Sequence, residues 1–110
     1  MKRKAIVLSM VLLVLLAGCS KSPSSVTKNF VTAIQKNDMG KIQANTTEKT
    51  TGVITTFAGL MRAGLGDAPV TVVKEQITGD TAVVTIKKAD GKEDRINLIK
   101  EKGAWKVTIR

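Results

Sequence analysis

The chain has 110 residues, which is enough for one domain. Its 18 Lys and Arg outnumber 9 Asp and Glu, so that its formal net charge is +9, and it contains no His, no Tyr and a single Cys. These absences exclude Ser-His and Cys-His catalysis, metal sites built from His or several thiolates, and an internal disulfide. The composition therefore predicts a small basic protein that is not an enzyme and uses no cofactor.

The first residues have the pattern of an export signal. Lys2, Arg3 and Lys4 precede Ala5–Ala17, a segment of thirteen residues in which Ser9 is the one polar side chain. A transmembrane helix is the alternative, but thirteen helical residues span about 20 Å of a hydrocarbon core that is ~30 Å thick. The pattern is typical of a cleaved secretory signal peptide.

The residues Leu16-Ala17-Gly18-Cys19 close this apolar segment. They resemble the lipobox of bacterial lipoproteins, in which Leu, a small residue, and Gly or Ala precede Cys. The resemblance implies a thioether-linked diacylglycerol on Cys19, cleavage in front of this residue, and acylation of the new amino terminus. Two or more acyl chains hold a protein firmly in a membrane, whereas a single chain binds marginally. The alternative is an ordinary secretory signal cleaved nearby, which leaves Cys19 as a free thiol.

The lipoprotein interpretation divides the chain into a signal peptide (1–18), a lipidated cysteine with its tether (19–25) and one domain (26–110). The signal peptide carries three of the cations, so the mature chain has a net charge of +6. We expect this chain at the cell envelope, where the lipid on Cys19 binds it to a membrane. Ser20 resembles an outer-membrane sorting residue. It implies the periplasmic face of the outer membrane in a Gram-negative host, and the outer face of the cytoplasmic membrane otherwise.

The tether leads into a helical pattern. Ser22 is a typical N-cap and Pro23 suits the first helical position, so we expect a helix that runs to about Asn37. Apolar residues at helical spacing predict the face that packs on the core. That face consists of Val26, Phe30, Ala33 and Ile34.

Two further helical segments are predicted before the pattern changes. Residues 39–45 form a short turn that packs Met39 and Ile42. A longer helix follows the Thr-rich segment 45–51 and ends at 64–69, where glycines and a proline break it. Its expected buried face consists of Val53, Phe57, Leu60, Met61 and Gly64.

From Val70 onward, apolar and polar residues alternate with the period of a strand. Gly79-Asp80 and Lys102-Gly103 are suited to two-residue turns, and Ala89-Asp90-Gly91 to a three-residue loop with Gly91 in the left-handed conformation. Four strands are therefore expected, over residues 70–78, 81–88, 92–101 and 104–109.

The turns fix the expected pairing of these strands. In the first hairpin, Glu75 lies opposite Val84 and Val73 lies opposite Ile86. In the second, Val84 lies opposite Ile96 and Ala82 lies opposite Leu98. One face is then apolar, with Val73, Ile77, Ala82, Val84, Ile86, Ile96, Leu98, Trp105, Val107 and Ile109. The order of elements indicates an α+β fold, in which N-terminal helices pack on one face of a curved four-stranded antiparallel meander.

Three groups of residues carry a resemblance to a known superfamily. They are Ser22-Pro23-x-x-Val26 with Phe30-x-x-Ala33 and Asn37-Asp38, then Ile77-x-Gly79-Asp80-x-Ala82-x-Val84, and finally Lys100-Glu101-x-Gly103-x-Trp105-Lys106-Val107. The chain resembles the nuclear-transport-factor-2-like (cystatin-like) superfamily and its small bacterial lipoproteins. The resemblance implies a cone-shaped domain, and because sheets of this superfamily often dimerise through an exposed face, it leaves both a homodimer and a monomer open. The enzymes of the superfamily use Asp/His or Tyr/Asp sets, and this chain has neither His nor Tyr.

Candidate ligand-binding residues come from both parts of the domain. Glu75 lies on the predicted apolar face, where a buried carboxylate is costly unless it is paired, so it is a candidate polar anchor with Val84 beside it. The alternative is that this end of the sheet is uncovered, or that a bulge turns Glu75 outward. Phe57 and Met61 are candidates for an adaptable lid, or else for core positions. Trp105 is either a platform for a ligand or a core residue.

Lys74, Lys87 and Lys106 share the other face of the predicted sheet. They form a modest basic patch that suits an anionic envelope component or an acidic protein, although exposed lysines are also the ordinary covering of a sheet. Nucleic acid is a poor partner, because the mature chain has three arginines and no aromatic residues interleaved with its cations. The sequence contains no pattern that predicts a metal site.

Two functions fit these observations. One is a membrane-anchored, non-enzymatic binding module that holds a small apolar ligand or an envelope partner in or on the cone-shaped domain. The other is a structural accessory or inhibitor-like lipoprotein that acts through its basic sheet face and has no ligand pocket. An apolar face that encloses a cavity of a few hundred Å³ or more favours the first function, and complete filling by helices favours the second.

Overall fold

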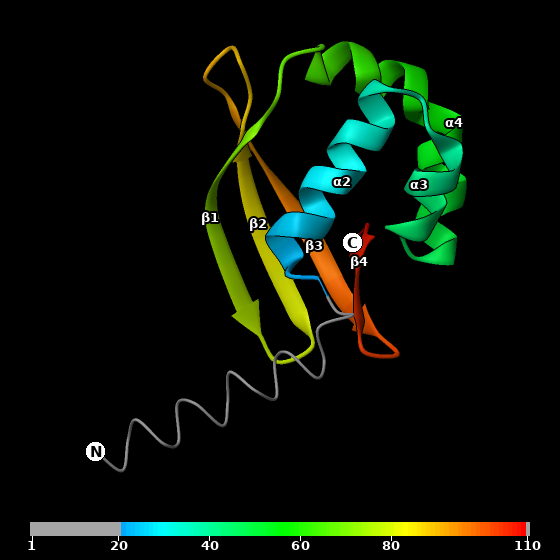
Figure 1. Ribbon diagram of the computed structural model, residues 1–110, viewed down its shortest axis with the longest axis vertical. Coiled ribbons are helices and arrows are strands. Elements are labelled where there is room, and N and C mark those ends of the chain that lie inside the picture. The colour runs from blue at the N-terminus through cyan, green and yellow to red at the C-terminus, as the bar shows by residue number, and fades with distance from the viewer. Residues whose placement is uncertain (1–20, 110) are drawn as a thin grey trace.

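The alternating segment forms an antiparallel sheet and the helical segments pack on one of its faces, as a computed structural model shows (Figure 1). The structure describes residues 21–109. Its helices are α2 (Pro23–Gln35), α3 (Met39–Ala44) and α4 (Glu48–Leu65), and its strands, paired in chain order, are β1 (Thr71–Thr78), β2 (Thr81–Lys87), β3 (Glu93–Glu101) and β4 (Ala104–Thr108). The predicted α+β architecture is confirmed. No helix in the described residues is long and apolar enough to cross a membrane.

Helix α2 begins with the N-cap that its sequence predicts and ends close to the predicted position. The Ser22 hydroxyl accepts a hydrogen bond from the Ser25 amide (3.1 Å), and a proline occupies the first helical position. After the last turn, Asn37 adopts a left-handed conformation (φ 56°), and the Asp38 amide donates to the Ala33 carbonyl (2.8 Å). The predicted core face is buried and is wider than expected, with Val26, Thr27, Phe30, Val31, Ala33 and Ile34.

This helix lies across the inner face of the sheet (Figure 1) and packs against β1, β2 and β4. Ile34 of the helix is fully buried, as are Val84 and Leu98 of the sheet. Ile77 and Ile109, which lie toward the ends of the same face, are about half exposed. The helices therefore cover the middle of the apolar face and leave parts of its ends open.

Strand pairing follows the predicted register except at the start of β1. Glu75 pairs with Val84 as expected, and the predicted pairs between β2 and β3 are also present. A bulge at Val73 brings Val72 opposite Ile86. The predicted pair of Val73 with Ile86 is wrong, because the extra residue reverses the alternation there, and the Val73 side chain is 45% exposed.

The two outer helices bury different residues from those expected. In α3, Ile42 is fully buried, but Met39 is 39% exposed and does not pack as predicted. The predicted face of α4 is wrong as well, since Val53, Phe57 and Leu60 are exposed, Gly64 is exposed, and Met61 is partly buried. The helix instead buries Thr50, Ile54 and Ala58.

Hydroxyl contacts explain which side of α4 faces the fold. Thr47 caps the helix, and its hydroxyl donates to the buried Thr50 hydroxyl (2.7 Å). The Thr50 hydroxyl also accepts a hydrogen bond from the Ile109 amide, just beyond β4 (3.1 Å). Because these contacts connect the start of α4 to the sheet, they turn the Thr50 side inward, and the larger apolar residues remain outside.

The Thr-rich segment before α4 runs beside the edge of β4. The Val107 amide donates to the Asn45 carbonyl (2.8 Å), and the Thr47 amide donates to the Val107 carbonyl (3.0 Å). The Thr46 hydroxyl donates to the Ile42 carbonyl (2.8 Å) and so holds this segment against α3. An edge strand exposes backbone groups that can pair with other chains, so this segment protects part of the edge of β4.

Two buried threonines lead to opposite predictions. Among residues 21–109, the Thr27 hydroxyl has no hydrogen-bond partner, whereas the Thr50 hydroxyl has the two partners described above. Thr27→Val is expected to raise the free energy of unfolding by about 1 kcal/mol, and Thr50→Val to lower it by about 1–3 kcal/mol. Urea unfolding followed by the fluorescence of Trp105, the single tryptophan, measures both changes. Shifts of the same sign in the two variants would contradict this assignment.

Candidate functional site

An apolar groove lies between α4 and the neighbouring ends of β3 and β4. Its volume is about 300 Å³, which is at the lower end of the range for small-molecule sites. Buried core residues contribute to it together with residues that are open to solvent. The lining consists of Phe30, Val53, Ile54, Phe57, Met61, Ile96, Val107 and Ile109, with Arg95, Asn97 and Thr108 as its polar members.

The α4 side of the groove belongs to a stripe of exposed apolar residues. Val53 is 40% exposed, Phe57 51% and Leu60 74%, and their spacing places them along one side of the helix. Ile109 lines the groove from the sheet and is 49% exposed. A contiguous apolar surface of this kind is typical of a site that binds a ligand or a partner.

The groove also adjoins an open strand edge. The last pair between β3 and β4 joins Asn97 to Thr108, so Glu93–Ile96 of β3 have no strand partner on this side among the described residues. Arg95 and Ile96 of this edge line the groove. The site therefore combines apolar side chains with backbone groups that are free to form hydrogen bonds.

The structure brings together two of the five predicted ligand-binding residues. Phe57 and Met61 both line the groove. Val84 is fully buried in the core, and Trp105, which is 8% exposed, lines a different cleft beside α2 and α3. Glu75 is likewise not part of the groove lining. Cys19 lies outside the described residues.

Glu75 has a partner at the start of α2. It lies on the inner face, as the register predicts, but its side chain is exposed. Its Oε1 atom accepts hydrogen bonds from the Ser24 amide (2.9 Å) and the Ser24 hydroxyl (2.7 Å). In the first turn of a helix, backbone amides have no partner within the helix and the dipole favours a negative charge. The contact supports a structural role for Glu75.

The three lysines of the predicted basic patch are not all available to one partner on the outer face of the sheet. Lys74 and Lys87 are exposed on neighbouring strands, on the outer side of the sheet. Lys106 belongs to the same side by register, but its Nζ atom donates to the Ala44 carbonyl at the end of α3 (2.6 Å). Lys87 lies opposite Glu93 in the pairing of β2 with β3.

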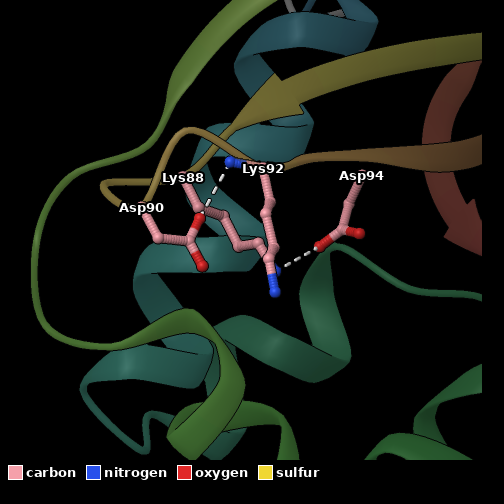
Figure 2. A network of polar contacts seen from close by, with 4 residues as sticks. All are labelled: Lys88, Asp90, Lys92 and Asp94. Carbon is pink, nitrogen blue, oxygen red and sulfur yellow. Dashed lines mark hydrogen bonds and ion pairs between the residues drawn. The ribbon is translucent and has the colours of Figure 1, made fainter.

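Sequence reasoning missed a polar network at the hairpin between β2 and β3 (Figure 2). Lys88 Nζ lies 3.1 Å from Asp94 Oδ2, and the side chains of the two residues are 16% and 51% exposed. The Asp90 carboxylate accepts a hydrogen bond from the Lys92 amide (2.9 Å), and Gly91 has the predicted left-handed conformation (φ 86°). A partly exposed ion pair contributes ~0–1 kcal/mol, so this pair adds little to the stability of the hairpin. No group of acidic, His or Cys residues within positions 21–109 could hold a metal ion.

The structural role of Glu75 leads to a prediction. Glu75→Ala removes both hydrogen bonds to Ser24 and the negative charge at the start of α2. We expect the free energy of unfolding in urea to fall by about 1 kcal/mol, while Gln76→Ala, at the next exposed position of β1, changes it by less than about 0.5 kcal/mol. Equal effects of the two substitutions would show that the contact does not stabilise the helix.

Comparisons with known proteins bear on the fold. No protein-family model matches the chain, and no curated protein matches it. Among solved structures, it is similar to a Campylobacter jejuni protein named "Putative NTF2-like transpeptidase", with a TM-score of 0.63 and 15% sequence identity. The match covers 82% of this chain and 100% of that one. At this identity the likeness shows the fold alone, and it agrees with the superfamily resemblance of the sequence. The domain has the NTF2-like fold.

Proposed function

We propose that this protein is a lipid-anchored, non-enzymatic binding module of the cell envelope, and that it holds a small apolar ligand in the groove beside α4. The observation that carries this proposal is the groove itself. Eight of its eleven lining residues are apolar, and Phe57 at its side is 51% exposed. A ligand that covers this surface removes apolar area from water, which is the main source of affinity in such sites.

The residues around the groove indicate what kind of molecule it accepts. Met61 has a flexible side chain that adapts to irregular apolar shapes. Arg95, Asn97 and Thr108 also line the groove, but their register places their side chains on the outer side of the sheet, so the polar groups at the groove are the unpaired backbone groups at the edge of β3. An amphiphilic molecule with a short apolar part and a polar end that pairs with backbone groups fits this arrangement.

The composition of the groove supports binding over catalysis. Its lining contains no carboxylate, imidazole or thiol that could serve as a nucleophile or a general base. The name of the Campylobacter jejuni protein includes a transpeptidase activity, but 15% identity carries none of that protein's reactive residues to this chain. We therefore propose a binding function.

The membrane part of the proposal depends on Cys19. Cys19→Ser removes the thiol that the lipobox resemblance assigns to lipidation, so we expect the protein to leave the membrane fraction or to be retained as an unprocessed precursor. Membrane fractionation with immunodetection, together with the intact mass of the extracted protein, measures this result. The matched control is Ser20→Ala, which leaves the thiol in place and should still yield a lipidated chain. An unchanged distribution and mass for Cys19→Ser would refute the lipid anchor.

The ligand part of the proposal has a direct test. The full chain is extracted with a styrene–maleic acid copolymer, so that no detergent competes for the groove, and native mass spectrometry detects what remains bound. We expect a small apolar or amphiphilic molecule with the wild-type protein. Phe57→Asp places a charge in the groove and should reduce the bound fraction by at least about tenfold, equivalent to ~1.4 kcal/mol.

Thr55→Asp is the matched control for this substitution. It puts the same charge on an exposed position of α4 that is not part of the groove lining, and should leave the bound fraction unchanged. If neither the wild-type protein nor the control retains a ligand, the groove is not a ligand site.

A second candidate function rests on the part of the stripe outside the groove. Leu60 is 74% exposed and does not line the groove, so a small ligand would leave it uncovered. An apolar segment of an envelope protein could cover Leu60 and Phe57 together. This function is favoured if a crosslinker placed at position 60 joins the chain to an envelope protein and the native mass spectrum contains no small molecule. The basic sheet face has less support, because Lys106 is bound to α3.

A further inference from the structure

A second cleft lies between α2, α3 and β4, apart from the apolar groove, and its volume is about 370 Å³. Its chemistry differs from that of the groove. Lys21, Lys41 and Lys106 line it with the amides of Asn29 and Asn45, and none of its lining residues is acidic. The cleft therefore collects positive charge and hydrogen-bond donors without a carboxylate to neutralise them.

The positive charge of this cleft is available to a ligand. Lys106 is held in place by its bond to the Ala44 carbonyl (2.6 Å), which uses one of the three donors of its ammonium group. Lys100 Nζ lies 5.6 Å from the centre of the Trp105 ring, and this indole lines the cleft. Within residues 21–109, the one ion pair belongs to the hairpin between β2 and β3, so none of these lysines is paired with a carboxylate.

One residue of the cleft is close in sequence to Cys19, and this closeness suggests the ligand. Lys21 follows Cys19 by two residues, and two extended residues span at most about 7 Å. This step rests on the proposed function, because it takes Cys19 to carry the lipid. If the acyl chains lie in the bilayer, Lys21 and the adjoining rim of the cleft are held close to the headgroup layer.

The geometry points to a binding site for the phosphate of an anionic phospholipid, in the same membrane that holds the anchor. Lysines bind phosphate as point charges and are attracted to anionic lipid surfaces, and an indole is suited to the boundary between polar and apolar layers. Occupation of the cleft fixes which end of the domain meets the membrane. The lipid on Cys19 then sets the distance of the domain from the bilayer, and the cleft sets its orientation.

The test uses the full chain in reconstituted vesicles. One set consists of phosphatidylcholine alone, and the other also contains phosphatidylglycerol. A trace of phosphatidylcholine with a spin label on its headgroup quenches Trp105 when the cleft lies at the membrane surface. We expect stronger quenching in the vesicles that contain phosphatidylglycerol. Lys21→Gln/Lys41→Gln should lower the ratio of docked to undocked molecules about fivefold for each lysine, the equivalent of ~1 kcal/mol.

A matched control separates the cleft from general charge. Lys74→Gln/Lys87→Gln removes the same charge from the outer sheet face and should keep the effect of phosphatidylglycerol. Both double variants leave the Lys106 contact with Ala44 intact, so folding is expected to be unaffected. The proposal is overturned if the control loses as much quenching as the cleft variant, or if phosphatidylglycerol has no effect on the wild-type protein.

Two additional measurements identify the source of the phosphate and the role of the anchor. Soluble glycerol phosphate, added to phosphatidylcholine vesicles, should not change Trp105 emission at concentrations comparable with the lipid. If it does, and phosphatidylglycerol adds nothing, the ligand is a soluble phosphorylated molecule and the lipid site is refuted. The mass of the extracted protein reports the lipid on Cys19 separately. If that lipid is absent, sedimentation of the same chain with anionic vesicles still tests the cleft.

Discussion

The packing of α2 across the inner face of the sheet is the interaction on which the rest of the structure depends. Ile34, Val84 and Leu98 belong to the core at this interface and have no exposed surface. The burial of each of these side chains contributes about 1.5–3 kcal/mol to the stability of the fold. Side chains from other elements hold both ends of the helix. Glu75 of β1 binds the first turn, and Arg62 of α4 donates from Nε to the Ile34 carbonyl near the last turn (3.2 Å).

The apolar groove follows from this arrangement. Because α2 occupies the middle of the sheet, α4 packs beside it, against α2, α3 and β4. The side with Thr50, Ile54 and Ala58 makes these contacts, so that the larger apolar residues of α4 face outward. The last β3–β4 pair is at Thr108, which leaves a space between the helix and the strands. The groove is thus a gap between α4 and the sheet. It is apolar because α4 carries more apolar residues than the core can bury.

Local signals explain how much of the fold could be predicted from the sequence. Glycines with positive φ at Gly79, Gly91 and Gly103 occupy the predicted hairpin loops, and the register that they imply is confirmed from Lys74 to Thr108. The N-cap of α2 was predictable for the same reason, since it depends on neighbouring residues. The bulge at Val73 was not, because no Gly or Pro marks it in the sequence.

Long-range contacts account for most of what the sequence did not reveal. The orientation of α4 depends on the bond between Thr50 and Ile109, which are 59 residues apart. Hydrophobic periodicity therefore identified the helix but assigned its apolar stripe to the core. Phe57 belongs to that stripe, so the periodicity singled it out as a candidate even though the stripe was assigned to the wrong side of the helix. The basic cleft joins Lys21 to α3 and β4, and no local pattern connects residues so far apart in the chain.

The central claim is that the groove beside α4 is a binding site for an apolar molecule. A crystal structure of the full chain, extracted from its own membrane with the copolymer, tests this claim most directly. The account predicts continuous density for an apolar or amphiphilic molecule between Phe57 and Ile109, with its polar end at the open edge of β3. A groove that is closed by the Phe57 side chain, or that holds only water, would contradict it.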